Sequence, residues 1–107
     1  MNPDLLRGNL ELILLSILAD GPKYGLEIIS EAKERTSGYF EFREGSLYPA
    51  LHRLERARLV DAEFVPSTRG PRRRYYRLTA SGSERLQEKR REWLEFTHAV
   101  EALWAAR

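Results

Sequence analysis

Hydrophobic residues recur along the first part of the chain at the spacing of α-helices. Residues 9–19 are apolar around nearly a whole helix, which is typical of a helix buried on most sides, and the Asp-Gly-Pro of residues 20–22 ends it. Residues 24–35 carry apolar side chains on one face and glutamates on the other. The pattern predicts two helices, followed by a polar connection over residues 36–44. The aromatic residues of this connection that we expect to cover the core are Tyr39, Phe40 and Phe42.

A third helix is predicted over residues 46–58, with Ser46 as its N-cap and Pro49 in its first turn, where a missing N–H costs nothing. Its inward face is a row at helical spacing: Leu47, Leu51, Leu54 and Arg58. Its opposite face is polar and cationic: Pro49, His52, Arg53 and Arg56. The helix therefore buries leucines and presents a positively charged face to solvent.

An alternation of polar and apolar residues replaces the helical spacing after this helix. Residues 59–65 and 72–79 each alternate as a half-buried strand does. Residues 66–71 between them contain proline, glycine and polar residues, so the pair predicts a hairpin. Thr79 is expected to cap a last helix that ends near residue 105. Three helices, a hairpin and a helix are the order of the winged helix-turn-helix, so the predicted fold is mainly α with a small β-hairpin.

The last helix is too long for the domain that carries it. Its 26 or so residues at ~1.5 Å each span about 39 Å, whereas a domain of this size has a radius of gyration near ~13 Å. Its apolar residues form a heptad seam. The seam consists of Leu86, Trp93, Phe96, Val100 and Leu103, with Trp104 off the seam, where it would cover the first helix of a partner. A seam left in water would be a large apolar patch, so we expect a homodimer.

These elements divide the chain into two parts. Residues 1–79 are predicted to form a winged helix-turn-helix DNA-binding domain, and residues 80–107 a long C-terminal dimerisation helix. A two-fold dimer presents two reading helices to a two-fold DNA site. Dimerisation through the last helix would therefore both cover its apolar seam and match the protein to such a site.

The composition excludes several classes of protein. The chain has 107 residues and no cysteine, which excludes a disulfide framework, a thiolate zinc site, an iron–sulfur cluster and a cysteine nucleophile. No apolar run reaches the ~20 residues of a membrane helix, and we see no signal peptide, so we expect a soluble, cytoplasmic protein. His52 and His98 lie on different helices without carboxylates at metal-binding spacing. We therefore expect no enzyme, no metal and no cofactor.

The charge is small in total and uneven along the chain. The net charge is +2, but residues 53–77 hold eight arginines and three acids, a local charge of +5. Arginine has a planar fork that suits phosphates and guanine edges, so double-stranded DNA is the expected partner. The alternatives are an arginine-rich solvated surface and a winged-helix module that binds proteins. The second alternative would favour acids on the third helix and a hairpin without arginines, and the chain has the reverse.

Three groups of residues are candidates for DNA contact. On the third helix they are Ser46, Tyr48, His52 and Arg53, although Tyr48 could simply pack and His52 could simply be solvated. On the hairpin they are Arg72, Arg73 and Arg74, of which one is expected to be structural because neighbouring strand residues face opposite ways. At the start of the second helix they are Lys23 and Tyr24, which could hold a phosphate with the helix amides.

Three motifs resemble the PadR family of bacterial transcriptional regulators. They are Tyr24-Gly25, residues 45–55 (GSLYPALHRLE), and residues 73–79 (RRYYRLT) followed by Gly82. The similarity covers about residues 10–86, and the single C-terminal helix is similar to that of the compact subfamily. The resemblance implies a homodimeric repressor that binds a palindromic operator and releases it when a small molecule binds.

The resemblance also implies a place for the effector. Several compact members carry a tryptophan where Trp93 falls, lining a hydrophobic pore between protomers that accepts flat aromatic compounds. Trp93 and Phe96 are therefore candidate effector contacts, with a plain dimer core as the alternative.

Arg58 departs from the family, which usually has glycine there; a left-handed backbone would place a penalty on arginine and turn it away from the buried side. Pro71 is also unusual and predicts a stiffer hairpin tip.

Overall fold

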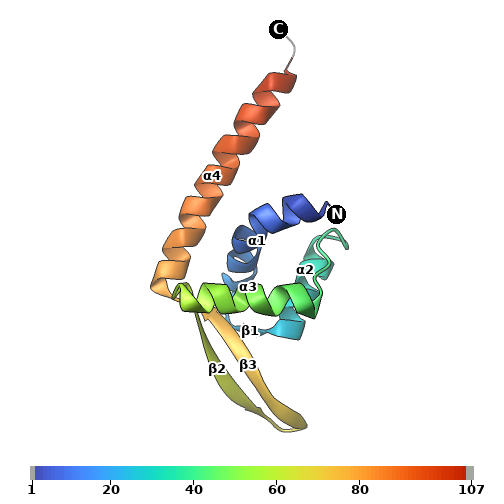
Figure 1. Cartoon of the computed structure of the whole chain (residues 1–107), viewed down its shortest axis with the longest axis vertical. Helices are drawn as coiled ribbons and strands as arrows, with labels where there is room; N and C mark the ends of the chain where they lie inside the picture. Colours follow the sequence, from blue (N-terminus) through green and yellow to red (C-terminus); the bar gives the residue numbers. More distant parts are fainter. Residues whose placement is uncertain (1, 106–107) are drawn as a thin grey trace.

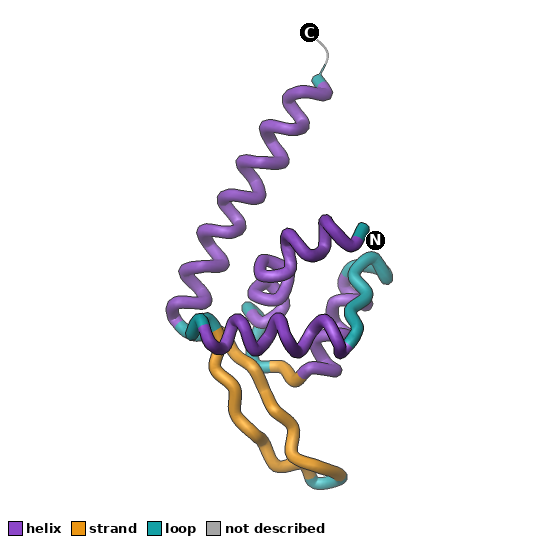
Figure 2. The backbone as a smooth tube through the Cα atoms, in the orientation of Figure 1, coloured by secondary structure: helices purple, strands orange, loops and turns teal. Residues whose placement is uncertain are grey.

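The computed structural model describes residues 2–105 and has the predicted winged-helix architecture (Figure 1). The elements in chain order are α1 (Pro3–Leu18), β1 (Lys23–Tyr24), α2 (Gly25–Arg35), α3 (Glu44–Arg56), β2 (Val60–Ser67), β3 (Gly70–Leu78) and α4 (Ala80–Trp104). Figure 2 shows the first three helices gathered together, with the β2–β3 hairpin projecting on one side and α4 on the other. The prediction of a mainly helical fold with a small β-hairpin is confirmed.

A single hydrophobic core holds α1, α2, α3 and the base of the sheet together. Its fully buried side chains include Leu14, Leu18, Ile28, Leu47, Leu51, Val60 and Tyr76. Each helix contributes the apolar face that its sequence pattern predicts. The helix α1 begins six residues earlier than predicted, because Asn2 caps it with a side-chain oxygen that accepts from the Asp4 N–H at 2.8 Å.

The sheet has three antiparallel strands in the order β1–β3–β2, one more than the sequence pattern predicts. The additional strand β1 is two residues long, with Lys23 opposite Tyr76 and Tyr24 opposite Tyr75. Two residues are too few to show an alternation, so the pattern could not reveal this strand. The hairpin is longer than predicted: its strands extend to Ser67 and Gly70, and a bulge falls between Val65 and Ser67.

The start of α3 differs from the prediction. The helix begins at Glu44 with Arg43 as its N-cap, so the assignment of Ser46 as N-cap is wrong. The Ser46 hydroxyl instead donates to the Arg43 carbonyl at 3.1 Å. Pro49 therefore lies in the second turn, where the carbonyl of Gly45 has no helical donor. Both residues are exposed, so water can satisfy this carbonyl.

The end of α3 is joined to the start of α4 by a set of contacts that we call the α3–α4 junction: Arg58, Leu59, Thr79 and Gly82. The Thr79 hydroxyl donates to the Arg58 carbonyl at 2.7 Å and accepts from the Gly82 N–H at 3.0 Å, which confirms Thr79 as the cap of α4. The Thr79 N–H donates to the Leu59 carbonyl at 3.1 Å. A Cβ on Gly82 would overlap that carbonyl, so the start of α4 approaches the segment after α3 as closely as the backbone allows.

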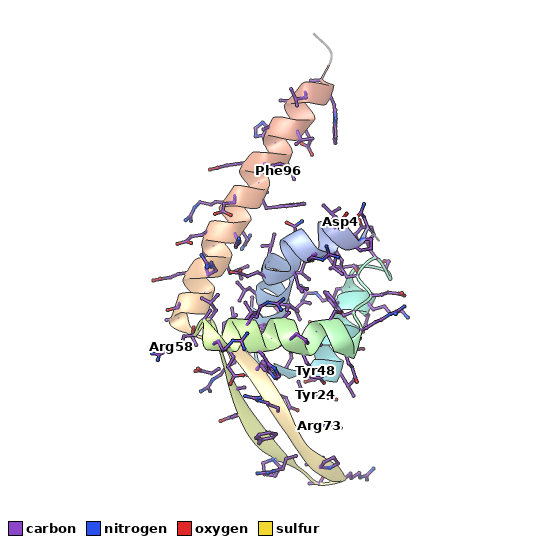
Figure 3. All side chains as sticks on the ribbon, viewed as in Figure 1. Asp4, Tyr24, Tyr48, Arg58, Arg73 and Phe96 are labelled. Carbon is purple, nitrogen blue, oxygen red and sulfur yellow. The ribbon has the colours of Figure 1, made fainter. Side chains whose placement is uncertain are left out.

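Arg58 in this junction has a φ of 62°, in the left-handed region. Its side chain is exposed, as Figure 3 also shows, so its predicted place on the inward face of α3 is wrong. The reason is the helix end itself: the left-handed residue lets the Leu59 N–H reach back to the Leu54 carbonyl at 3.0 Å and turns Arg58 outward.

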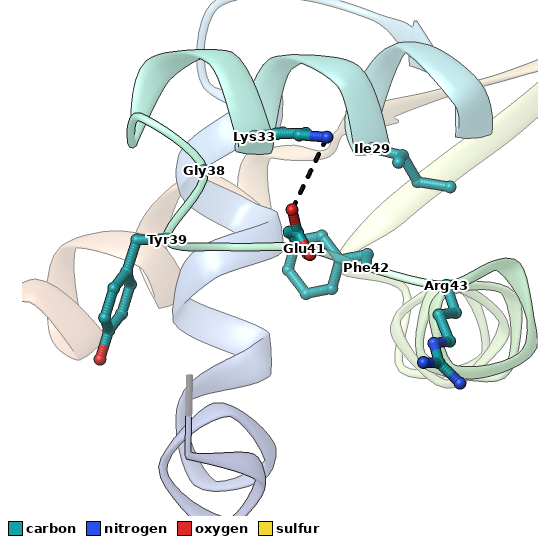
Figure 4. A pocket seen from close by; sticks show the side chains of 7 residues that line it. All are labelled: Ile29, Lys33, Gly38, Tyr39, Glu41, Phe42 and Arg43. Carbon is teal, nitrogen blue, oxygen red and sulfur yellow. Dashed lines mark ion pairs between the residues drawn. The ribbon is translucent and has the colours of Figure 1, made fainter.

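The α2–α3 connection places its aromatic residues unequally. Phe42 is buried, Phe40 is half-buried and Tyr39 is exposed, so the prediction holds for the two phenylalanines and is wrong for the tyrosine. An open hollow of about 430 Å³ lies beside this connection. The Lys33 Nζ and a Glu41 carboxylate oxygen are 3.6 Å apart, and Figure 4 shows the two side chains facing each other. The pair is exposed and contributes little to stability.

The helix α4 makes the molecule elongated. Its 25 residues span about 38 Å, and the radius of gyration is 15.6 Å with extents of 61 × 29 × 21 Å. Only its first turns pack on the core, through Gly82 and Leu86. Leu86 is 5% exposed and packs in the core of this chain, so its predicted place on a dimer seam is corrected to a core position. Within residues 2–105, no helix combines the length and apolarity needed to cross a membrane.

Candidate nucleic-acid interface

The exposed face of α3 is centred on three residues that lie opposite its buried leucines. Pro49, His52 and Arg56 are exposed and are separated by three and four positions, so they form one stripe along the helix. Arg53 and Ser46 are also exposed but lie at one margin of this stripe. Arg53 lines a groove between α1, α3 and α4, so it faces away from the hairpin side of the helix.

Tyr48 lies at the opposite margin of the stripe and is half-buried. Its ring packs on Gly25, where any Cβ would overlap the phenol, so glycine at the start of α2 lets α3 approach. Burial raises the pKa of Tyr48 above its usual value, and the nearby Glu44 carboxylate adds to the rise. The structure thus gives Tyr48 the packing role that the sequence left open, with its hydroxyl turned toward α2.

The start of α2 is less suited to a phosphate than predicted. The side chain of Lys23 is only 11% exposed, and its Nζ lies 3.4 Å from the Glu31 carboxylate. Lys23 is therefore paired with Glu31 within the protein, and the prediction that it contacts a phosphate is corrected. The Glu27 carboxylate accepts from the Tyr24 N–H at 3.1 Å. A negative charge already occupies this helix N-terminus, which opposes a second anion there.

The hairpin is a two-sided arm that carries arginines on both faces. Arg74 faces α3, and its guanidinium donates to the Glu55 carboxylate at 2.6 Å. It is the one structural arginine that strand alternation predicts, and it fixes the hairpin base to α3. Arg72 is exposed on the same face, with its guanidinium carbon 5.0 Å from the centre of the Phe64 ring. Arg73 is exposed on the other face.

Comparison with known proteins identifies this combination of helices and arm. Residues 14–88 match the transcriptional regulator PadR-like family. The chain belongs to this family. Its structure is similar to that of a transcriptional regulator from Clostridium thermocellum, with a TM-score of 0.85 and 32% identity over 99% of both chains.

Two further structures place this PadR-like protein in the family. A PadR-like transcriptional regulator from Bacillus cereus has a TM-score of 0.83 and 30% identity, and the alignment covers 97% of this chain and 99% of the other. Bacillus subtilis PadR, solved in complex with operator DNA, has a TM-score of 0.68 and 25% identity; the alignment covers 79% of this chain and 45% of that one. The resemblance drawn from the three sequence motifs is confirmed.

Two residues of this PadR-like protein belong to the candidate interface but are not among the DNA-contact candidates drawn from the sequence. Arg56 lies at the centre of the exposed stripe of α3, and Arg69 is exposed at the hairpin tip. The sequence already placed Arg56 on the cationic face, four positions after His52, and this spacing is the signal that makes it a candidate. Phe64, which supports Arg72, is an exposed aromatic on the hairpin.

The second candidate site of this PadR-like protein is a groove between α1 and α4, about 450 Å³ in volume. Its apolar lining comes from Leu5 and Leu12 of α1 and from Trp93 and Phe96 of α4. Trp93 is 39% and Phe96 63% exposed, so the structure brings both candidate effector residues to one open surface. Further along α4, Leu103 is 83% exposed and Trp104 is also exposed, while Val100 is half-buried.

Proposed function

We propose that this PadR-like transcriptional regulator is a homodimeric repressor that binds a palindromic operator through the exposed face of α3 and the hairpin. The observation that carries the proposal is the placement of exposed arginines: Arg53 and Arg56 on α3, and Arg72 and Arg73 on an arm that Arg74 ties to the same helix. The operator complex of Bacillus subtilis PadR supports the same use of this fold.

The helix α3 and the hairpin have different shapes, so they are assigned different contacts with DNA. A helix fits the major groove and can place arginine on guanine edges, whereas arginines on an extended ribbon reach phosphates. We therefore assign His52, Arg53 and Arg56 to sequence reading and Ser46 to a phosphate at the helix start. Arg72 and Arg73 take phosphate contacts that do not depend on sequence.

The test is equilibrium binding to DNA fragments that the wild-type protein selects from a random pool. Affinity should fall steeply with salt, because several phosphate contacts release counterions. Arg53→Ala or Arg56→Ala should relax the sequence preference, while Arg73→Ala should weaken all sequences alike. Arg90→Ala on the exposed side of α4 is the matched control, since it removes the same charge away from the interface. A protein that selects no fragment, or binds with no salt dependence, would disprove the proposal.

The dimer is supported by the apolar surface that the far half of α4 leaves open. Trp93, Phe96, Leu103 and Trp104 are all exposed and lie on one side of α4, and an apolar surface of this extent marks an interaction site. Sedimentation should give a dimer for the wild type and a monomer, or a much weaker dimer, for Leu103→Glu. Glu101→Gln on the same part of the helix should leave the dimer intact. A wild-type monomer at micromolar concentration would contradict the dimer.

Release by a small aromatic effector is supported by the open apolar groove at Trp93 and Phe96. A flat ligand held there in the dimer would favour one angle between the two α4 helices, and so one spacing of the α3 helices. The chain has two tryptophans, so Trp104→Phe leaves Trp93 as the sole tryptophan reporter. Titration with aromatic compounds should quench this fluorescence and weaken DNA binding. If no compound does both, the effector part of the proposal is wrong.

A further inference from the structure

Arg73 and Tyr24 make a contact that none of the roles assigned above uses. Tyr24 of β1 lies opposite Tyr75 of β3, and their rings meet edge to face with centres 5.4 Å apart. The guanidinium carbon of Arg73 lies 4.4 Å from the centre of the Tyr24 ring. Figure 3 shows both residues on the same side of the hairpin. Tyr24 therefore supports an exposed arginine of the arm from the strand that leads into α2.

The stacked geometry leaves the hydrogen-bond donors of Arg73 available. A planar guanidinium contacts an aromatic ring through its face, while its N–H groups point outward from its edges. A phosphate can accept from these edges without breaking the stack. An arginine that is already held on a ring also loses less conformational freedom when it binds, which strengthens the bound state.

The surroundings of Tyr24 argue against a direct phosphate contact of its own. Its neighbour Lys23 is buried against Glu31, and the Glu27 carboxylate is bound to the Tyr24 N–H. The start of α2 therefore lacks a free cation and carries a negative charge. Tyr24 can therefore contribute to DNA binding through the contact of its ring with Arg73.

We propose that Tyr24 is a positioning residue that holds Arg73 for a DNA phosphate through its aromatic ring and not through its hydroxyl. This inference rests on the proposed DNA-binding function. It assigns the two-residue strand β1 a purpose, since the pairing of Tyr24 with Tyr75 is what places the ring beneath Arg73.

The experiment compares Tyr24→Phe with Tyr24→Leu in binding to the DNA fragment selected by the wild type. Tyr24→Phe keeps the ring and should bind within about twofold of the wild type. Tyr24→Leu should lose about five- to thirtyfold for a dimer that uses two arms. The salt dependence should stay unchanged in Tyr24→Leu, because the charge is still present, and should decrease in Arg73→Ala. In the Arg73→Ala background, Tyr24→Leu should have no further effect.

Two controls separate positioning from a loss of structure. Tyr39→Leu removes an exposed tyrosine far from the arm and should leave affinity unchanged. In the free protein, the NMR signal of the Arg73 Nε–H should be shifted by the Tyr24 ring in the wild type and Tyr24→Phe, and should return to a normal position in Tyr24→Leu.

The outcomes distinguish this inference from the proposed function. Equal losses in Tyr24→Phe and Tyr24→Leu would show that the hydroxyl contacts DNA, and wild-type affinity in Tyr24→Leu would show that the stack positions nothing; either result overturns the inference. A protein that binds DNA but lacks the ring-induced shift also overturns it. A protein that shows the shift but selects no DNA refutes the proposed function, and the phosphate role of Arg73 with it.

Discussion

Replacing Arg58 by glycine should make this PadR-like protein more stable. The φ of 62° at this position costs a residue with a Cβ about 1–2 kcal/mol. Glycine avoids that cost but adds about 0.5–1 kcal/mol of freedom to the unfolded chain. The side chain is exposed, and the hydrogen bonds to Glu55 and Thr79 are made by the backbone of Arg58, so glycine keeps them. The expected net gain in the free energy of unfolding is about 0.5–1 kcal/mol.

Thermal unfolding at a fixed protein concentration measures this gain, since the stability of a dimer depends on concentration. For a chain of this length, about 0.5–1 kcal/mol corresponds to a rise in Tm of about 2–8 °C. Arg58→Ala is the matched control: it removes the same side chain and charge but keeps a Cβ, so it should gain nothing. Equal stability of the two variants, or an Arg58→Gly variant less stable than the wild type, would refute the argument from backbone strain.

Three further predictions test other contacts. Gly82→Ala should lower the free energy of unfolding by about 1–3 kcal/mol, because its Cβ would overlap a carbonyl, whereas Gly45→Ala on open helix should be neutral or slightly stabilising; urea unfolding of both checks this. Arg74→Ala and Glu55→Ala should each cost about 0.5–1 kcal/mol and together little more, and additive losses in a double-mutant cycle would exclude coupling. Burial raises the pKa of Tyr76 above its usual value near 10, so the unfolded chain ionises first and the free energy of unfolding should fall as pH rises above 10; Tyr76→Phe should reduce that fall in urea titrations.

The sequence predicted the fold wherever a periodic pattern was long enough to be read. Residues 24–35 and the alternating stretches after residue 59 gave α2 and the hairpin nearly at their observed bounds. Thr79 was recognised because a hydroxyl before an apolar helix has one common use, as a cap. The strand β1 was missed because its two residues pair only through contacts with β3, which no local pattern reveals.

The candidate site was predictable in kind but less so in detail. Strand alternation predicted that one of the three hairpin arginines is structural, but only the structure shows that Arg74 has this role, because Glu55 lies 19 residues away in sequence. The phosphate contact predicted for Lys23 is corrected for a similar reason. Its partner Glu31 lies eight residues further along the chain, in α2, and no local pattern predicts that pairing. The prediction of Ser46 as N-cap is wrong because the N-cap is Arg43, three residues earlier, whose side chain makes no capping hydrogen bond for a sequence pattern to reveal.

The α3–α4 junction has a consequence for how the protein could change shape. Thr79 bonds to the carbonyls of Arg58 and Leu59, which directly follow α3, and Gly82 rests against the second of them. The start of α4 is thus held by backbone and cap contacts to the residues that directly follow α3. We expect a partner or small molecule that tilts the free end of α4 to act first on this junction, so a signal received at the tail has a short route to the end of α3.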